Sequence, residues 1–345
     1  MGRMSDFEYT LPESFIAQFP KDKRDESKLL VLDRKTLAIQ HRIFKDITEF
    51  IKPGDCLVIN KTKVFPAKVF CKKATGGNIE ILFLRKINEN SWAGLCRQKI
   101  LDKNLFFSDG KISAKVLEKN DTGEFILEFE PGIDVFKLIN EFGEMPLPPY
   151  IKRKAEKSVF KKDDYKKYQT VYAKVVGSIA APTAGLHFTE DVLKKLKEKG
   201  VKIAEIVLHI GWGTFRPIIS EDVSKHVMLP EKYEIGTEQA EMINCAKKSG
   251  GKIFAAGTSA VRTLETVSQN DGLIKPTIGE TGLFIYPGYK FKCVDAMITN
   301  FHLPKSTPIV LVSALAGREN ILNAYRSAIE NNYSFYSYGD AMLIL

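Results

Sequence analysis

The chain has 345 residues, of which 44% are hydrophobic and 27% are charged, so it can bury a full core and is not disordered by composition. Its net charge of +9 is compatible with a polyanionic partner such as a nucleic acid. No apolar run approaches the roughly 20 residues that span a bilayer, and the first residues lack the apolar segment of a signal peptide. We therefore expect a cytoplasmic protein without membrane contacts. Five scattered cysteines without a CxxC pair argue against a disulfide framework and against a zinc site.

The first half of the chain is dominated by short apolar runs. Leu29–Leu32 and Cys56–Asn60 are predicted strands, and Pro53-Gly54-Asp55 is a turn signal. Clusters of Gly, Asn, Asp and Lys separate the runs that follow, and such spacing predicts a small antiparallel barrel or sandwich. These runs are Val64–Phe70, Ile79–Leu84, Trp92–Cys96, Ile112–Leu117 and Phe125–Phe129.

From about Lys154 the pattern changes to alternating strands and helices. Thr189 can cap a helix that Gly200 ends, and Val201–Ile210 then has the composition of a buried strand. This alternation predicts an α/β layer with ligand loops at the strand ends. The further elements are a helix over Thr237–Ser249, a strand over Lys252–Ala256, a helix from about Thr258, strands over Gly282–Tyr286 and Asp295–Phe301, and helices over Pro308–Ala316 and Ile321–Asn331.

Because the opening segment fits the α/β part, the barrel is predicted to be an insertion. We expect a larger, discontinuous α/β domain with a mixed sheet, formed by residues 1–62 and 154–345. A small antiparallel β-barrel domain, residues 63–153, interrupts it.

The connection on the return side of the barrel is strongly basic. Lys152–Lys174 contains nine basic and three acidic residues, with Tyr165, Tyr168 and Tyr172 interleaved. Such a segment suits phosphate contacts combined with base stacking. A solvated, lysine-rich surface loop is the alternative.

The stretch from Tyr168 to Phe188 is rich in Gly, Pro, Thr and Ala and ends on a histidine before a helix start. Small residues let a backbone approach a ligand closely, and Gly185 tolerates backbone angles that other residues resist. His187 is therefore a candidate site residue. The alternative is a tight connection with a buried histidine.

Two further segments place histidines near predicted strand ends. His209 precedes Gly211 and Gly213, but Arg216 stands where a dinucleotide fingerprint needs its third glycine. A glycine-rich turn with His and Arg can still contact a nucleoside or a carboxylate, although a core histidine is equally compatible. His226 and Glu231 form a weaker candidate pair.

The remaining candidates follow predicted strands as well. Gly257, Thr258 and Ser259 stand at a helix N-terminus, with Arg262 one turn later, which suits an anionic group. For Arg262 a surface ion pair is the alternative. The segment after the next strand contributes Asn300 and His302, and Asp340 near the C-terminus is either buried or catalytic. Several histidines gathered together suit proton transfer near neutral pH, so the residues alone indicate an α/β enzyme.

Nine ordered motifs, covering about Asp6 to Leu343, are similar to those of the S-adenosylmethionine:tRNA ribosyltransferase-isomerase family. They are LPESFIAQFP, PGDCLVINKTKVFPAKV, GGNIEIL, MPLPPYIKR, YQTVYAKVVGSIAAPTAGLHF, LHIGWGTFRP, AAGTSAVRTLET, YPGYKFKCVDAMITNFHLPKST and YSYGDAMLI. The resemblance implies an α/β domain with an inserted β-barrel. It also implies transfer and isomerisation of the ribosyl moiety of S-adenosylmethionine onto 7-aminomethyl-7-deazaguanine at the anticodon wobble position, giving epoxyqueuosine with release of adenine and methionine.

The resemblance further implies partners and site roles. The partners are S-adenosylmethionine as cosubstrate and the anticodon stem-loop of a tRNA with a GUN anticodon, without a prosthetic group or metal, and we expect a monomer. The expected catalytic residues are His187, His302, His209, His226, Glu231 and Asp340. The expected cosubstrate-binding residues are Thr183, Gly185, Gly211, Gly213, Arg216, Gly257, Thr258, Ser259, Arg262 and Asn300.

Some positions depart from the pattern of this family. Leu229 stands where a second histidine is usual, Lys225 where an aspartate is common, and Lys63 where an arginine is usual. A lysine does not reproduce the bidentate fork of an arginine.

Two alternatives of other functional classes remain. One is an S-adenosylmethionine-dependent RNA methyltransferase, although the acidic and glycine-rich first loop of that class is not visible in the sequence. The other is a non-catalytic RNA-binding protein.

Overall fold

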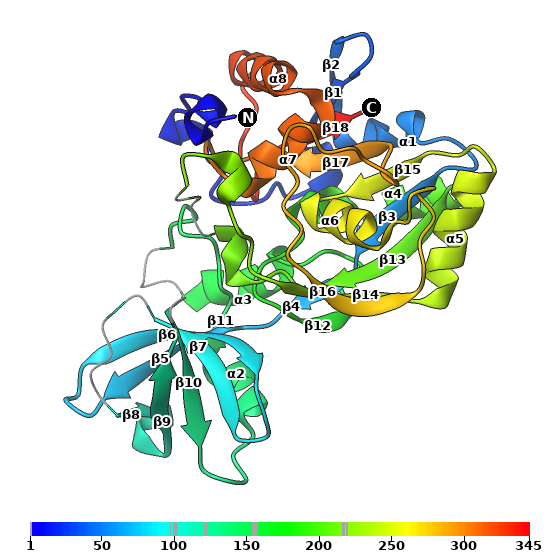
Figure 1. The fold of residues 1–345 in the computed structure, drawn as a ribbon. Coiled ribbons are helices and arrows are strands. Elements are labelled where there is room, and N and C mark those ends of the chain that lie inside the picture. The colour runs from blue at the N-terminus through cyan, green and yellow to red at the C-terminus, as the bar shows by residue number, and fades with distance from the viewer. Residues whose placement is uncertain are drawn as a thin grey trace.

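Two bodies of different architecture make up the chain, a large α/β part and a β-barrel that projects from it (Figure 1). The structure is a computed structural model that describes residues 2–96, 98, 103–120, 123–153, 158–215, 218 and 220–345. Within these ranges, no helix combines the length and the apolar composition that a membrane crossing requires.

A nine-stranded mixed sheet forms the centre of the α/β part. Its central strands β13, β3, β15 and β17 run parallel to one another, and β18 returns antiparallel beside β17. In spatial order the strands are β16 (Thr277–Thr281), β14 (Glu231–Ile235), β13 (Lys202–Leu208), β3 (Cys56–Asn60), β15 (Ile253–Ala256), β17 (Ala296–Asn300), β18 (Ala341–Ile344), β1 (Lys28–Leu32) and β2 (Ile39–Ile43).

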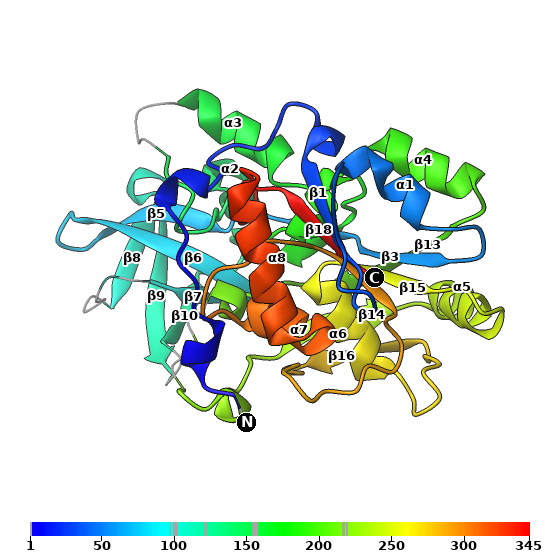
Figure 2. The same ribbon diagram turned by 90° about the horizontal axis from the view of Figure 1, so that it is seen from above.

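Helices cover both faces of this sheet, because its central strands are apolar on both sides. On β3, Val58 packs into one core and the neighbouring Leu57 and Ile59 pack into another. Figure 2 shows α1 and α4 on one side of the sheet and α6, α7 and α8 on the other. The helices are α1 (Ile47–Phe50), α4 (Glu190–Glu198), α5 (Thr237–Lys248), α6 (Thr258–Val267), α7 (Thr307–Ala316) and α8 (Arg318–Glu330).

The barrel has its own buried core and closes through the pairing of β5 with β8. Phe83, Phe107 and Phe129 pack together inside it. Its strands are β5 (Lys68–Lys73), β6 (Asn78–Lys86), β7 (Ser91–Leu95), β10 (Glu124–Phe129), β9 (Ile112–Lys119) and β8 (Asn104–Phe107), with the short β11 (Gly143–Glu144) beside β5. The separate core supports the proposed division at residues 63–153, which stays a prediction.

Connecting elements join the two bodies. The parallel pair β4 (Thr62–Val64) and β12 (Val175–Ser178) lies where the chain leaves and re-enters the α/β part. The helix α2 (Val135–Phe142) packs into the barrel core through Val135, Leu138 and Ile139, and α3 (Ser158–Lys167) follows the barrel in the chain. Short 3-10 helices are η1 (Met4–Phe7), η2 (Glu13–Phe15), η3 (Arg24–Glu26), η4 (Phe44–Asp46), η5 (Ser108–Gly110), η6 (Thr183–His187), η7 (Trp212–Phe215) and η8 (Val223–Lys225).

The predicted α/β fold with an antiparallel barrel is confirmed, and one predicted strand is wrong. Gly282–Tyr286 is not a strand; the strand β16 ends at Thr281, just before it. The carbonyl groups of Thr281 and Leu283 accept hydrogen bonds from the Arg262 guanidinium at 3.1 and 2.9 Å. These carbonyls are thus satisfied by a side chain, and the segment can leave the sheet without losing hydrogen bonds.

Candidate active site

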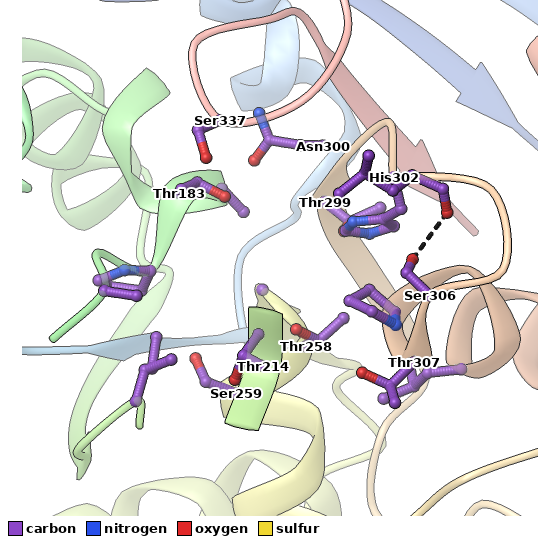
Figure 3. Close-up of a pocket in the computed structure, with 18 of the residues that line it drawn as sticks. Thr183, Thr214, Thr258, Ser259, Thr299, Asn300, His302, Ser306, Thr307 and Ser337 are labelled. Carbon is purple, nitrogen blue, oxygen red and sulfur yellow. Dashed lines mark hydrogen bonds between the residues drawn. The ribbon is translucent and has the colours of Figure 1, made fainter. Parts of the chain in front are cut away.

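A pocket opens at the carboxyl ends of the parallel strands β13, β15 and β17 (Figure 3). Ligand sites in open α/β sheets favour this edge, because loops from several strands meet there. Polar side chains and an aromatic and aliphatic wall line it together. The polar residues are Thr183, Thr214, Glu231, Thr258, Ser259, Arg262, Thr299, Asn300, His302, Ser306, Thr307 and Ser337, and the apolar wall includes Tyr150, Tyr168, Met228, Phe284, Phe301, Leu303 and Tyr336.

Two helix N-termini meet at this pocket. Gly257 has φ +92°, a conformation that L side chains rarely adopt, and it turns the chain from β15 into α6. Thr258 and Ser259 begin α6, while Ser306 and Thr307 begin α7, and all four line the pocket. The first N–H groups of a helix lack intrahelical acceptors and carry partial positive charge. This end of the pocket therefore suits an anionic group such as a carboxylate.

A buried ion pair joins Glu231 on β14 to Arg262 on α6. Both residues are about 95% buried, with 5% exposed, and the Arg262 Nη1 atom contacts the Glu231 Oε2 atom. The other oxygen, Oε1, accepts hydrogen bonds from the Gly211 N–H at 2.8 Å and from the Thr214 hydroxyl at 3.2 Å. The Arg262 charge is thus compensated inside the protein, so Arg262 orients Glu231 and the neighbouring loop.

His302 is the one histidine among the described residues that lines the pocket. Its Nε2 atom lies 2.7 Å from the Thr299 hydroxyl, and its main-chain N–H donates to the Tyr325 hydroxyl at 2.9 Å. Burial lowers the pKa of His302 to about 3. The ring is therefore neutral at physiological pH.

His187 lies behind the pocket instead of in its wall. Its ring stacks on Phe44 at 5.1 Å, and only 5% of the residue is exposed. The Nδ1 atom lies 2.8 Å from the Ser27 hydroxyl and the Nε2 atom 3.1 Å from the Asn300 amide nitrogen. Burial, together with the nearby Lys21 and Arg24 charges, lowers the pKa of His187 to about 3. With both nitrogens engaged by protein groups, the ring holds Asn300 in place.

The other two predicted histidines also lie outside the pocket wall. His209 contacts the Thr62 hydroxyl through Nδ1 at 2.8 Å, and burial lowers its pKa, with a further contribution from Lys232. Its ring fills the space in front of Gly177, where a Cβ atom would lie 2.6 Å from the ring. The His226 ring packs edge-on against Phe284 at 4.9 Å, and Phe284 does line the pocket.

Asp340 is buried and fully occupied by structural hydrogen bonds. It accepts from the main-chain N–H groups of Lys28 and Ser334, each at 2.7 Å, and lies 3.4 Å from the Lys21 ammonium group. It joins the C-terminal loop to β1 and does not line the pocket. This arrangement gives Asp340 a structural role.

The predicted cosubstrate-binding residues divide into two groups. Thr183, Gly257, Thr258, Ser259, Arg262 and Asn300 line the pocket. Gly211 lies beside the lining Glu231, Gly213 lies beside Leu229, which does not line the pocket, and Gly185 makes room for Tyr172, whose hydroxyl would stand 2.1 Å from a Cβ atom at that position. Arg216 lies outside the described residues.

The sequence did not single out several lining side chains. Thr299, Ser306, Thr307 and Ser337 were inside the recognised motifs, but nothing in a linear pattern distinguishes a hydroxyl that faces a pocket from one that caps a turn. Tyr150 and Tyr168 come from the connection after the barrel and reach the pocket through tertiary packing.

Within the described ranges, no three His, Cys, Asp or Glu side chains gather to hold a metal ion.

The base-stacking role that the sequence predicted for Tyr168 and Tyr172 is wrong. Tyr168 is 0% exposed and Tyr172 is 6% exposed, so neither ring can stack on an RNA base at the surface. Tyr165 is exposed, and its hydroxyl donates to the Gly143 carbonyl at 2.6 Å. Both Tyr168 and Tyr172 pack in buried clusters, and Tyr168 also forms part of the pocket wall.

Fold and pocket together define a two-part α/β protein with a candidate ligand site at the carboxyl edge of a mixed sheet. Residues 4–344 match the family described as queuosine biosynthesis protein, and the chain belongs to this family. It is 49% identical to the S-adenosylmethionine:tRNA ribosyltransferase-isomerase of Thermoanaerobacter sp. (strain X514) and 48% identical to that of Caldanaerobacter subterraneus subsp. tengcongensis, in each case over 99% of this chain and 100% of the relative.

A solved structure is similar as well. The crystal structure of an S-adenosylmethionine tRNA ribosyltransferase from Thermotoga maritima is 38% identical, with a TM-score of 0.56. The similarity covers 99% of this chain and 100% of that chain.

Breaking the buried Glu231–Arg262 pair is expected to be strongly destabilising. Arg262→Leu leaves an uncompensated buried carboxylate, so we expect a loss of about 3–5 kcal/mol in the free energy of unfolding, measured by denaturant titration. The matched control is Lys194→Leu, which removes an exposed i,i+4 pair with Glu198 and should change stability by less than about 0.5 kcal/mol. Equal effects of the two substitutions would contradict the structural role of Arg262.

The neutral state of His187 is expected to make stability depend on pH. The unfolded chain takes up a proton near pH 6.5 and the folded one only near pH 3, so stability falls as the pH drops below about 6.5. Between pH 7.5 and 5.5 this residue alone should account for about 1.4 kcal/mol. The comparison is the pH dependence of unfolding in wild type and in His187→Gln. A dependence that is identical in both proteins would show that His187 is not held neutral.

Proposed function

We propose that this protein is an S-adenosylmethionine:tRNA ribosyltransferase-isomerase that uses the pocket described above. The observation that carries the proposal is the full-length family match, and six of the nine motifs contribute residues to the wall of this one pocket. The product is epoxyqueuosine at the tRNA wobble position. S-adenosylmethionine is consumed as the ribosyl donor, and adenine and methionine are released.

This reaction moves protons as well as the ribosyl group. A base removes a proton from the ribosyl carbon beside the sulfonium, whose positive charge acidifies that carbon. The bond between ribose and adenine breaks, and adenine leaves with a proton. The neutral aminomethyl nitrogen of the modified base bonds to the ribosyl group and loses a proton, a ribosyl oxygen forms the second C–O bond of the epoxide, and the C–S bond breaks so that the sulfur departs as the thioether of methionine.

We assign proton acceptance to His302. It is the one histidine among the described residues that lines the pocket, and burial leaves its ring neutral; because the same burial lowers its basicity, His302 is assigned on the position of its ring and not on its pKa. Its contact with the Thr299 hydroxyl fixes the ring orientation. Four residues first expected to be catalytic are instead assigned structural roles around the pocket, because none of their side chains is part of its wall. They are His187, His209, His226 and Asp340. Glu231 remains in the wall, where it fixes the Gly211 and Thr214 loop.

We assign the methionine carboxylate to the N-termini of α6 and α7. Thr258, Ser259 and Thr307 present hydroxyl groups beside the first N–H groups of both helices (Figure 3). Two converging helix N-termini stabilise one anionic group more than either does alone. Arg262 is not needed for this contact, since Glu231 already compensates its charge.

The tRNA is proposed to lie along the basic connection at residues 152–174. Parts of this segment are already engaged: Arg153 forms a two-pronged pair with Asp164, and Lys174 contacts Glu205 at 2.8 Å. Lys166 is exposed on α3.

We further propose that the tRNA substrate has a GUN anticodon, that the protein is a monomer and that it is located in the cytoplasm.

The product assay is the experiment that tests the proposed function. The purified protein is incubated with S-adenosylmethionine and tRNA carrying 7-aminomethyl-7-deazaguanine, and the digest is analysed by mass spectrometry. Adenine, methionine and an epoxyqueuosine-sized nucleoside are expected. S-adenosylhomocysteine would indicate a methyltransferase, and tRNA binding without product would indicate a non-catalytic RNA-binding protein.

Removing the His302 imidazole should slow this reaction. For His302→Ala we expect kcat to fall by about 100-fold or more, which is the usual contribution of a positioned acid or base. The control is His41→Ala, because His41 is exposed on β2, outside the pocket wall. Turnover within about threefold of wild type in His302→Ala would remove His302 from the mechanism.

Neutralising lysines in the basic connection should weaken tRNA binding and flatten its salt dependence. For the triple variant Lys152→Gln, Lys166→Gln, Lys174→Gln, the slope of log affinity against log salt should fall by up to about 2–3. The control neutralises the exposed Lys194, Lys195 and Lys197 on α4. If both triple variants keep the wild-type slope, the RNA binds elsewhere.

A further inference from the structure

Two pocket-lining residues carry a buried polar atom without a hydrogen-bond partner among the described residues, the Asn300 Oδ1 atom and the Tyr168 hydroxyl. Asn300 ends β17, is 2% exposed and lines the pocket, and its Oδ1 atom receives no hydrogen bond from any described residue. A buried acceptor without a partner is unfavourable, so such atoms in native proteins call for an explanation. In Figure 3 the amide of Asn300 faces the part of the pocket bounded by Thr183 and Ser337.

The orientation of this amide is fixed by its neighbours. The Asn300 Nδ2 group donates to the Tyr336 carbonyl and to the His187 Nε2 atom, each at 3.1 Å. A main-chain carbonyl only accepts, so the nitrogen must face Tyr336 and the oxygen must face away. Rotating the amide by 180° would place two acceptors against each other.

A chain of hydrogen bonds behind Asn300 sets the tautomer of His187. The Ser27 hydroxyl donates its single hydrogen to the Arg24 carbonyl at 3.0 Å, so toward His187 it can only accept. The His187 Nδ1 atom therefore carries the hydrogen, and Nε2 is left as an acceptor for Asn300. His187 thus holds Oδ1 toward the pocket without contacting the ligand itself.

The surroundings of Oδ1 indicate which donor it takes. The Tyr150 and Tyr336 rings lie 4.9 Å apart, and the Tyr150 hydroxyl contacts the Ser337 hydroxyl at 2.7 Å. This end of the pocket is aromatic and uncharged, whereas the helix N-termini that favour a carboxylate lie around Thr258 and Thr307 (Figure 3). A neutral amide oxygen beside aromatic rings matches the amino group of a planar base better than a charged ammonium group.

Resting on the proposed function, we infer that Asn300 is a specificity-determining residue whose Oδ1 atom accepts a hydrogen bond from the exocyclic amino group of the adenine of S-adenosylmethionine. His187 is its positioning residue. A 6-oxo purine presents an acceptor at this position, so the site disfavours it.

The test compares binding of S-adenosylmethionine with that of its 6-oxo analogue by titration calorimetry, so it needs no turnover. Wild type should prefer the amino compound by at least about tenfold, and Asn300→Ala should bring the ratio to within about twofold. His187→Phe should lower the ratio as well, and His187→Gln, which offers an acceptor near the Nε2 position, should restore part of it. Asn323→Ala, an exposed asparagine on α8, is the control and should keep the wild-type ratio.

Two outcomes would overturn the inference: a wild-type protein that does not discriminate, or an Asn300→Ala ratio that stays at the wild-type value. If, in the second case, Asn300→Ala also loses affinity for free methionine, Oδ1 is assigned to the methionine ammonium group. Because the readout is binding, a preference lost in Asn300→Ala supports the inference even if the product assay is negative. Product formation without any preference would remove the inference alone.

Discussion

The buried pair of Glu231 and Arg262 is the contact on which the candidate site depends most. It joins the start of β14, the helix α6 and, through the other guanidinium nitrogens, the segment that follows β16. The free carboxylate oxygen then holds the loop that follows β13. A buried ion pair need not add stability over an apolar pair, but the loss of one partner is strongly unfavourable. Several pocket segments are therefore fixed relative to one another by a single charge pair.

Around that pair the pocket is built mainly from neutral groups and helix ends. His187 and His302 are both held neutral by burial, and the hydroxyl groups around them set their hydrogen-bond partners. The partial charges that remain available are those of the α6 and α7 N-termini. Such an environment suits a cosubstrate with a carboxylate at one end and an uncharged base at the other, since each end finds a different part of the wall.

Apolar periodicity was the most reliable structural signal in the sequence. The alternation of apolar runs located the barrel, the parallel strands and the helices, because burial of one face imposes a period on the sequence. The strand predicted over Gly282–Tyr286 does not form. The carbonyl groups of Thr281 and Leu283 accept hydrogen bonds from the Arg262 guanidinium, which is distant in sequence, and not from a neighbouring strand. The predicted base stacking by Tyr168 and Tyr172 is also wrong. Their charged sequence neighbours indicated an exposed segment, but both rings pack in the interior of the protein.

The sequence alone determined the fold class, the family resemblance and most segments of the pocket, since these depend on local periodicity and on motifs of adjacent residues. It also predicted that the barrel is an insertion. Only the tertiary structure decided which residues within those segments face the ligand. His187 and His302 lie in equally distinctive motifs, yet one stacks behind the wall and the other forms part of it. The direction of a side chain depends on partners from distant segments, such as Ser27 for His187 and Thr62 for His209, and no local pattern encodes those contacts.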